Sequence, residues 1–491
     1  MHKHQQTTEA VDLKQLAHRE MVDYSFWPDF SKDCQKQLQQ IQSSGAPVVD
    51  NSIKDLRNLL WSSIDNIESQ DLDQIEYTER LPNGDIKLLV GIADVDLSVG
   101  RDTALDQHAA NNCFSIYTGV ITFPMFPTPL SEGITSLLQD QDRQCTITEM
   151  VISKDGTIKS SDVYRGLVRN KAKLAYEPVS DWLHGKADLP QLKTTPGLEE
   201  QLKTQDELAN WLYDLHHRSG ELTVQTIEAQ PVMENGTVLD MQVREQNRAR
   251  EIIKNFMISA NITLAEFLRG KKSPLIERVV REPKRWPKLI ELAAQYNFKL
   301  PADPDPVALN NFVSDRKNKD PEHFPDLSLT VVKLLGPGEY VVQLPNEPST
   351  GHFGLAVHEY THSTAPNRRY PDLVTQRLVK AILSGKPSPY SDDDLKRICE
   401  QCVDREERAR KLERFMRKAA AAVLLANQIG KVYDAIVTGA SSQGTYVRLK
   451  RPPAEGRVVE NEQGLDVGDS CRVKLVSTDP SKGFIDFARV K

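Results

Sequence analysis

The sequence predicts an α+β protein with more than one domain, and three observations support this fold class. Residues 55 to about 110 contain apolar runs that alternate with turn signals, such as the Pro-Asn-Gly sequence at residues 82–84, which is typical of strands. Residues 246–268 carry an apolar stripe at helical spacing. From Gly430 onward, short alternating strands return with glycine turns between them, which indicates a second, β-rich domain.

The composition is that of a globular protein without a global charge signal. At 491 residues, the chain is long enough for several domains with sizeable cores. The net charge is −7, so a nucleic-acid-binding surface would have to be local. No apolar run is long enough to span a bilayer, and the segment MHKHQQTTEA lacks the apolar core of a signal peptide. We therefore expect a cytoplasmic protein that does not contact a membrane.

Three aspartates follow the first predicted strand. An apolar run predicts a buried strand that ends at Asp65, and Asp71 and Asp73 stand two residues apart. If that segment is extended, alternation places Asp71 and Asp73 on one face and turns Gln74 to the other. Clustered carboxylates can hold Mg²⁺ against a substrate phosphate. An isolated D-x-D pair, however, is more often a solvated loop.

A second polar stretch leads into a predicted helix. Tyr360 opens this stretch, and Arg368 and Arg369 stand directly before the helix, whose apolar side includes Leu373 and Leu378. Arginine side chains at the start of a helix can clamp a phosphate group, because the guanidinium donates paired hydrogen bonds. The two stretches together therefore indicate phosphate chemistry.

These stretches resemble the ribonuclease II (RNB) family of processive 3′-to-5′ exoribonucleases. That family carries the signatures I-D-x5-D-x-D-D and Y-T-x-x-T-S-P-I-R-R-Y-x-D. Further motifs follow in the order of the family: VGIADV from Val90, FPMFPTPLSEGITSL from Phe123 and NKAKLAYEPVSDWL from Asn170. The resemblance extends from about Lys54 to Leu383, and several separate motifs make it specific.

The resemblance implies a catalytic domain with a mixed sheet, surrounding helices and a central RNA channel. The pattern after Gly430 resembles the OB-fold RNA-binding module, a β-barrel of the ribosomal-protein type, that follows this domain in the family. Many relatives also carry cold-shock OB-folds before the catalytic domain, and we expect none of them in this chain. The expected domains are a helical N-terminal cap (1–50), the RNB catalytic domain (51–390), a helical connection that packs on it (391–428) and the OB-fold (429–491).

By resemblance, the chain hydrolyses single-stranded RNA from its 3′ end and releases nucleoside 5′-monophosphates. Asp65, Asp71 and Asp73 would be catalytic residues that hold Mg²⁺, with Mn²⁺ as an alternative, and Asp73 would be indispensable. Arg368 would be the fourth catalytic residue and would stabilise charge on the scissile phosphate, while Arg369 would contact the RNA backbone. We expect a monomer that binds single-stranded RNA and has no obligate protein partner.

Four aromatic residues are candidates for RNA stacking. Tyr117 matches a base-stacking tyrosine of the family, and Tyr176 matches the tyrosine that stacks on the 3′-terminal base and helps to set the length of the final fragment. Packing in the core is the alternative for Tyr176. In the OB-fold the candidates are Tyr446 and Phe484. Candidate contacts to the RNA backbone in that module are Arg448, Lys450, Arg472 and Lys474.

The sequence departs from the family pattern at several positions. Gln74 stands where the family has a fourth aspartate, and its amide oxygen can accept a metal ion but supplies no charge. Glu76 and Glu68 are candidates to compensate. Lys254 and Asn255 stand where relatives usually carry an acidic residue. We favour an active exonuclease, with a catalytically weak or inactive RNA-binding protein that uses the same channel as the alternative.

Two other patterns need an interpretation. His358-Glu359-Tyr360-Thr361-His362 matches H-E-x-x-H, which holds zinc in proteases when it lies on a continuous helix. Because a proline follows four residues later, we interpret the match as coincidence. We also expect a strand beginning near Leu222 and a long charged helix over residues 391–428.

Overall fold

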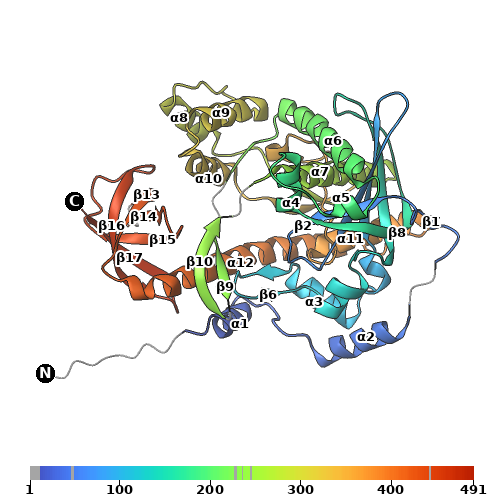
Figure 1. Cartoon of the computed structure of the whole chain (residues 1–491), viewed down its shortest axis with the longest axis horizontal. Helices are drawn as coiled ribbons and strands as arrows, with labels where there is room; N and C mark the ends of the chain where they lie inside the picture. Colours follow the sequence, from blue (N-terminus) through green and yellow to red (C-terminus); the bar gives the residue numbers. More distant parts are fainter. Residues whose placement is uncertain are drawn as a thin grey trace.

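Strands and helices are mixed through the larger part of the chain, and a separate barrel forms its C-terminal end (Figure 1). Figure 1 shows this barrel at one end of the molecule, the central sheet toward the other end, and the long helix α12 between them. The predicted α+β fold class with a C-terminal barrel is confirmed. This computed structural model describes residues 11–45, 49–225, 229–234, 236–243, 246–441 and 444–490.

A mixed sheet of six strands forms the centre of the larger part, in the order β1-β8-β2-β3-β4-β7. β1 and β2 run parallel to β8, and the other neighbours are antiparallel. The long β8 pairs with β7 through its first part and with β2 through its last part. The bounds are β1 (Lys54–Asp55), β2 (Trp61–Asp65), β3 (Gln74–Arg80), β4 (Ile86–Ala93), β7 (Asp142–Ile152) and β8 (Ile158–Ala175).

Helices cover both faces of this sheet. On one face, α11 and the start of α12 share a core with Trp61 and Ile75. On the other face, α6 and α7 pack on Leu88 and Val90, because side chains two apart on β4 point to the same side. Phe256, on the predicted apolar stripe of α7, is fully buried. The bounds are α3 (Ala104–Asn112), α4 (Tyr176–Leu183), α5 (Gln191–Thr194), α6 (Leu198–Ser219), α7 (Arg248–Gly270) and α11 (Tyr370–Leu383).

Smaller elements surround this body. Three helices form a cluster with its own core around Trp286 and Phe312, namely α8 (Trp286–Gln295), α9 (Pro306–Lys319) and α10 (Phe324–Leu335). Three small antiparallel sheets pair β5 with β6, β9 with β10 and β11 with β12, and the α8–α10 cluster separates β11 from β12 along the chain. Their bounds are β5 (Ile116–Tyr117), β6 (Thr122–Phe123), β9 (Ala229–Glu234), β10 (Thr237–Val243), β11 (Leu275–Val279) and β12 (Glu339–Gln343).

The N-terminal segment is helical, and one expected strand is missing. The helices are α1 (Leu13–Asp23) and α2 (Lys32–Ser43); residues 1–10 and 46–48 of the predicted cap lie outside the described residues. The strand predicted near Leu222 is wrong, since residues 221–225 form none. The side chain of Leu222 enters the core of the α8–α10 cluster, and its N–H donates to the carbonyl of Gly354 at 2.9 Å. Tertiary packing therefore uses this apolar residue without sheet pairing.

The long helix α12 (Asp392–Leu425) joins the body to the barrel. It begins with a capping box, in which Ser391 and Asp394 satisfy each other's backbone N–H groups. The barrel is closed, with strand order β13-β14-β15-β17-β16. Its strands are β13 (Val432–Ser441), β14 (Gly444–Leu449), β15 (Glu455–Glu460), β16 (Ser470–Asp479) and β17 (Phe484–Val490).

Ion pairs hold the barrel against α10 and the residues before it. The Arg448 guanidinium and the Asp326 carboxylate are both buried and form two contacts, of 2.8 and 3.0 Å. Lys450 pairs with Glu322 at 3.0 Å. The Arg448 guanidinium, predicted to contact the RNA backbone, is thus held by an acidic partner from another part of the chain, and its contact with RNA stays a prediction. Arg472 and Lys474 are exposed on β16.

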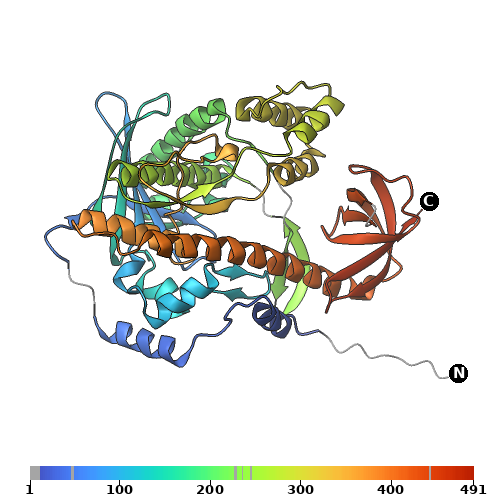
Figure 2. The ribbon, with the colours of Figure 1, turned by 180° about the vertical axis from the view of Figure 1, so that it is seen from behind.

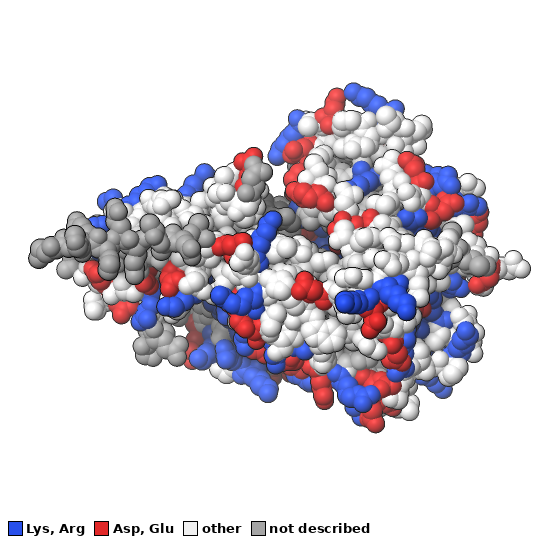
Figure 3. Space-filling model, turned by 90° about the horizontal axis from the view of Figure 1, so that it is seen from below, with Lys and Arg blue, Asp and Glu red and all other residues white. Residues whose placement is uncertain are grey.

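Surface charge is mixed on the face shown in Figure 3. Lys and Arg side chains lie among Asp and Glu side chains there, without a large area of one sign. This face therefore carries no large basic patch. Within the described ranges, no helix has both the length and the apolar character needed to cross a bilayer.

A buried arginine fixes the position of α11. Arg377 is 4% exposed and contacts the carboxylates of Asp96 at 2.9 Å and Asp106 at 2.8 Å. It also donates to the hydroxyl of Tyr390 at 2.7 Å and to the carbonyl of Val99 at 2.8 Å. These partners come from the segment after β4, from α3 and from the segment before α12, so one side chain joins three parts of the body.

We expect Arg377→Met to destabilise the protein by about 3–5 kcal/mol, because it leaves the buried Asp106 carboxylate without its cation. The change should appear as a lower midpoint of urea unfolding followed by circular dichroism. Lys203→Met is the control, since Lys203 pairs with Glu199 on the surface, where solvent screens the pair, and should leave the midpoint almost unchanged. Equal losses in the two variants would contradict the role of Arg377.

Acid should weaken the contact between α3 and the chain before α2. His108 is 2% exposed beside the ring of Phe30, and burial lowers the pKa of His108 from 6.5 to about 4. The unfolded chain therefore binds a proton at this residue between these pH values that the folded chain excludes, and the contribution of His108 to the free energy of unfolding should fall by about 3 kcal/mol from pH 7 to pH 4. His108→Gln should remove this part of the pH dependence in denaturation curves. An unchanged pH dependence would refute it.

Candidate active site

The predicted aspartates lie where β2 ends and β3 begins. β2 ends at Asp65, as predicted, and its antiparallel register with β3 pairs Ser62 with Glu76. Extending this register to the end of β2 places Asp65 opposite Asp73. Residues far along the chain complete the site, because Arg368 stands directly before α11 and reaches Asp73.

Asp73 is the most enclosed member of this group. It is 1% exposed; one carboxylate oxygen accepts from Nε of Arg368 at 3.0 Å and the other accepts from the backbone N–H of Asn367 at 3.1 Å. Burial raises the pKa of Asp73 to about 7, and the nearby Arg368 guanidinium only partly offsets this effect. The Arg368 side chain itself remains 43% exposed, so part of its guanidinium faces solvent.

Asp65 and Gln74 form the second contact of the group. Nε2 of Gln74 donates to Oδ1 of Asp65 at 3.2 Å, while Oδ2 of Asp65 is buried without a partner. Burial raises the pKa of Asp65 to about 6. The prediction that Gln74 points away from the aspartates is wrong, because regular alternation begins only with β3 at Gln74 and residues 71–73 form no strand.

Asp71 and the two glutamates occupy different surroundings. Asp71 is half-buried, and its negative charge acts on both Asp65 and Asp73. Glu68 is exposed on the turn after β2. Glu76 is fully buried on β3 with both oxygens unpartnered, and burial together with the Asp65 charge raises the pKa of Glu76 well above its ordinary value. Glu76 therefore lies inside the sheet rather than on the open side of the site.

The donor chemistry of this group fits a hard divalent cation. Carboxylate and amide oxygens are the ligands that Mg²⁺ prefers. Burial raises the pKa values of Asp65 and Asp73, and the Arg368 guanidinium offsets this only in part, while Oδ2 of Asp65 has no hydrogen-bond partner and is free to bind a cation. In the described part of the chain, no group of three His, Cys, Asp or Glu side chains is close enough together to hold a metal ion in this conformation. The carboxylates are instead held by Arg368 and Gln74.

The two tyrosines predicted to stack on RNA lie beside the aspartates. Tyr117 is 43% exposed and lies within reach of the charges of Arg368 and Asp73. Tyr176 is the first residue of α4, and the negative charge of Asp65 acts on its hydroxyl group. The Arg250 guanidinium lies 4.3 Å from the centroid of the Tyr176 ring. Two aromatic rings therefore lie near the aspartate group.

The remaining predicted RNA contacts lie apart from the aspartates or are occupied. The guanidinium of Arg369 donates to Asp372 at 2.6 Å and to Thr364 at 3.3 Å, so it is held within the start of α11. Tyr446 and Phe484 lie on the barrel and are 39% and 58% exposed. The structure therefore brings Asp65, Asp71, Asp73, Gln74, Arg368, Tyr117 and Tyr176 together, but not Arg369, Tyr446 or Phe484.

Sequence reasoning missed Arg250. This residue lies in the first turn of α7, donates to the side chains of Asn66 at 3.1 Å and Glu177 at 2.8 Å, and covers the ring of Tyr176. A basic residue in the first turn of a helix, three residues after the N-cap Asn247, is unfavourable, because the helix dipole favours acidic residues there. This unfavourable position of an arginine is the feature of the sequence that could have identified Arg250 as a functional residue.

The H-E-x-x-H match does not form a zinc site. Residues 356–362 contain no helix. His358 is exposed, Glu359 pairs with Arg269, and the half-buried His362 hydrogen-bonds the hydroxyl of Tyr340 at 2.8 Å. The interpretation of this match as coincidence is confirmed.

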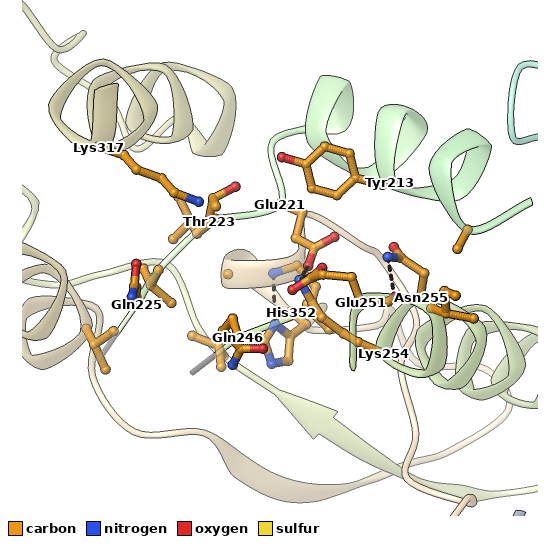
Figure 4. A pocket seen from close by; sticks show the side chains of 18 of the residues that line it. Tyr213, Glu221, Thr223, Gln225, Gln246, Glu251, Lys254, Asn255, Lys317 and His352 are labelled. Atoms are coloured by element: carbon orange, nitrogen blue, oxygen red, sulfur yellow. Dashed lines mark hydrogen bonds and ion pairs between the residues drawn. The ribbon is translucent and has the colours of Figure 1, made fainter. Parts of the chain in front are cut away.

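A separate cavity of about 990 Å³ lies beside α6 and α7 (Figure 4). Figure 4 shows Glu221, Glu251 and Lys254 pointing toward one another, and Lys254 pairs with Glu221 at 2.8 Å. Asn255, at the position where relatives carry an acid, hydrogen-bonds His216 at 3.2 Å. None of the three aspartates lines this cavity.

Comparison with known proteins agrees with this geometry. The RNB domain family matches residues 53–385, and the RNase II-type exonuclease C-terminal S1 domain matches residues 431–490. Ribonuclease R of Thermotoga maritima is 30% identical over 474 residues, which cover 89% of this chain and 65% of that relative. The chain thus spans less than two thirds of the length of this relative.

Two solved structures share the fold. Mycoplasma genitalium RNase R, in complex with ribose-methylated single-stranded RNA, matches with a TM-score of 0.87 at 24% identity, over 98% of this chain and 78% of that chain. Yeast Ssd1, described as a pseudonuclease, matches with a TM-score of 0.73 at 18% identity, over 92% of this chain and 56% of that chain. From its sequence, its fold and the position of its aspartates, the chain belongs to the RNB family, and its barrel is an RNase II-type S1 domain.

Proposed function

We propose that this protein is a metal-dependent 3′-to-5′ exoribonuclease that hydrolyses single-stranded RNA to nucleoside 5′-monophosphates. The contact between Asp73 and the half-exposed Arg368 carries the proposal, since it places a buried carboxylate and a solvent-facing cation at one point. The relatives named ribonuclease R support this activity class. A cytoplasmic location and a monomeric state are part of the same proposal.

Each residue of the site would have a different role in the reaction. Arg368 would exchange part of its contact with Asp73 for the scissile phosphate and stabilise the charge that develops there. Tyr117 and Tyr176 would stack on terminal bases, and Tyr176 would help to set the length of the last fragment. Asp65, Asp71, Asp73 and the amide oxygen of Gln74 would hold Mg²⁺ or Mn²⁺. When bound, this ion would activate water and polarise the phosphate.

A catalytically weak or inactive RNA-binding protein is the second candidate. Gln74 favours it, because its amide supplies no charge to a metal ion and its Nε2 is directed at Asp65. Metal-dependent release of nucleotides separates the two candidates. RNA binding alone does not, since both would use the same stacking residues.

Asp73→Asn should abolish nucleotide release, with a loss of at least about 100-fold, because it removes a charge at the reacting phosphate. The measurement is the shortening of a 5′-labelled single-stranded oligoribonucleotide at single-nucleotide resolution, with Mg²⁺ or Mn²⁺. The surface variant Asp85→Asn is the control and should match the wild type. If the wild type binds the RNA but never shortens it, the second candidate function is correct.

Gln74→Asp should increase the dependence of the protein on Mg²⁺. Without metal, the added carboxylate loses the hydrogen bond to Asp65 and repels it, so the melting temperature in EDTA should fall. With Mg²⁺, the added charge should lower the half-saturating metal concentration by about 10-fold. Melting curves across a Mg²⁺ series measure both effects, and Gln74→Ala is the control that only removes the hydrogen bond. Equal Mg²⁺ responses in the two variants would exclude residue 74 as a ligand.

A further inference from the structure

Arg250 lies beside the tyrosine to which the proposed function gives the terminal base. Its guanidinium is 4.3 Å from the centroid of the Tyr176 ring, and Nη2 donates to the side chains of Asn66 at 3.1 Å and Glu177 at 2.8 Å. These partners come from the turn after β2 and from the start of α4, which packs against both β2 and α7. Figure 2 shows the body that holds these elements at one end of α12 and the barrel at the other. Arg250 therefore belongs to the aspartate end of the molecule.

Part of the Arg250 guanidinium has no partner. A guanidinium can donate five hydrogen bonds, and both bonds of Arg250 leave from Nη2. Among the described residues, Nε is buried without a partner and Nη1 forms no hydrogen bond. The side chain is 19% exposed, so it is partly accessible from solvent. Arg250 therefore has donors left for a ligand.

The contact with Glu177 can be exchanged at little cost. The Glu177 side chain is 59% exposed, so solvent screens its attraction to Arg250. A terminal phosphate group carries more negative charge than one carboxylate and can accept two parallel hydrogen bonds from a guanidinium. Such a group would therefore replace Glu177 as the partner of Arg250.

The position of Arg250 on α7 also suits an anionic ligand. Arg250 stands in the first turn of this helix, where the helix dipole disfavours a cation and favours an anion. If Arg250 only oriented the Tyr176 ring, contact with the ring would be sufficient, and the open donors and this unfavourable position would have no purpose. A negatively charged ligand at Arg250 accounts for both.

The order of the groups along the site indicates which part of the RNA would reach Arg250. In the proposed function, the reacting phosphate lies at Asp73 and Arg368, and the terminal base stacks on Tyr176. The charge of Asp65 acts on the Tyr176 hydroxyl, whereas Arg250 covers the ring. The 3′ oxygen of the terminal nucleotide is its end away from the reacting phosphate. A group carried on that oxygen would therefore lie toward Arg250.

We propose that Arg250 binds a phosphate group on the 3′ end of RNA, so that strands ending in a 3′-phosphate are substrates. This inference rests on the proposed function, since it uses the same site. In the first turnover, water would attack the last internucleotide phosphorus. Its hydroxyl would stay on that phosphorus, and its proton would pass to the 3′ oxygen of the preceding nucleotide as the bond to that oxygen breaks. The products are a nucleoside 3′,5′-bisphosphate and a strand with an ordinary 3′-hydroxyl.

The first test measures binding by competition, using fluorescence anisotropy in EDTA. Three unlabelled strands of five nucleotides have one sequence and end in a 3′-hydroxyl, a 3′-phosphate or a 5′-phosphate. The wild type should bind the 3′-phosphate strand about 10-fold more tightly than the other two, because a guanidinium pairs with the added phosphate. Arg250→Gln keeps a planar polar side chain without charge and should bring this ratio close to one.

Two further variants test charge and specificity. Arg250→Lys keeps the charge without the paired donors and should retain part of the preference. Arg80→Gln removes an arginine that pairs with Glu207 on the surface and should leave all three affinities unchanged. Each protein is judged by the ratio of its affinities for two strands, which does not depend on the fraction that is folded.

The second test identifies the first product. With Mg²⁺ and the 3′-phosphate strand, mass spectrometry should detect one nucleoside 3′,5′-bisphosphate per strand, followed by nucleoside 5′-monophosphates. Arg250→Gln should slow release of the bisphosphate by about 10-fold and leave the later steps unchanged, since only the first nucleotide carries the added phosphate.

The possible results distinguish this inference from the proposed function. An unchanged affinity ratio in Arg250→Gln would overturn the phosphate site, as would an equal loss for all three strands, which would leave Arg250 with the orientation of Tyr176 alone. A wild type that shortens the 3′-hydroxyl strand but not the 3′-phosphate strand would also overturn it, while the exonuclease would stand. A wild type that releases no nucleotide would overturn the exonuclease, and a ratio that depends on Arg250 would still support the phosphate site.

Discussion

The ion pair between Asp73 and Arg368 is the contact on which the site depends. It joins positions 295 residues apart, one at the start of β3 and the other at the start of α11. The sheet fixes Asp73, because the antiparallel register of β2 and β3 sets it opposite Asp65. The buried cation Arg377 fixes α11, because its partners come from three parts of the body. Packing remote from the aspartates thus sets their geometry.

Burial gives this site its electrostatic character. Asp65 and Asp73 both have raised pKa values, since desolvation outweighs the single nearby guanidinium. Such a group gains from any added positive charge, which explains why its oxygen donors suit a divalent cation. Gln74 reduces the negative charge of the group by one compared with the family signature. The same amide also stabilises Asp65 through a hydrogen bond, so the exchange weakens metal binding while it eases the repulsion between carboxylates.

Helix α12 connects the two functional parts of the molecule. Its first half shares the core of the body, and its second half packs against the β9–β10 hairpin and the barrel. The acidic partners of Arg448 and Lys450 keep the barrel against α10 and the residues before it.

The sequence by itself determined the fold class, the strand that ends at Asp65, the buried stripe of α7 and the barrel after Gly430, because hydrophobic period and turn residues are local signals. The sequence motifs also predicted that Asp65, Asp73 and Arg368 belong to one site. Only the tertiary structure decided that Gln74 turns toward Asp65, that Arg448 is buried against Asp326, that Arg250 covers Tyr176 and that Leu222 packs without a strand. Each of these depends on a partner distant in the chain, and a one-dimensional pattern carries no information about which distant residues meet.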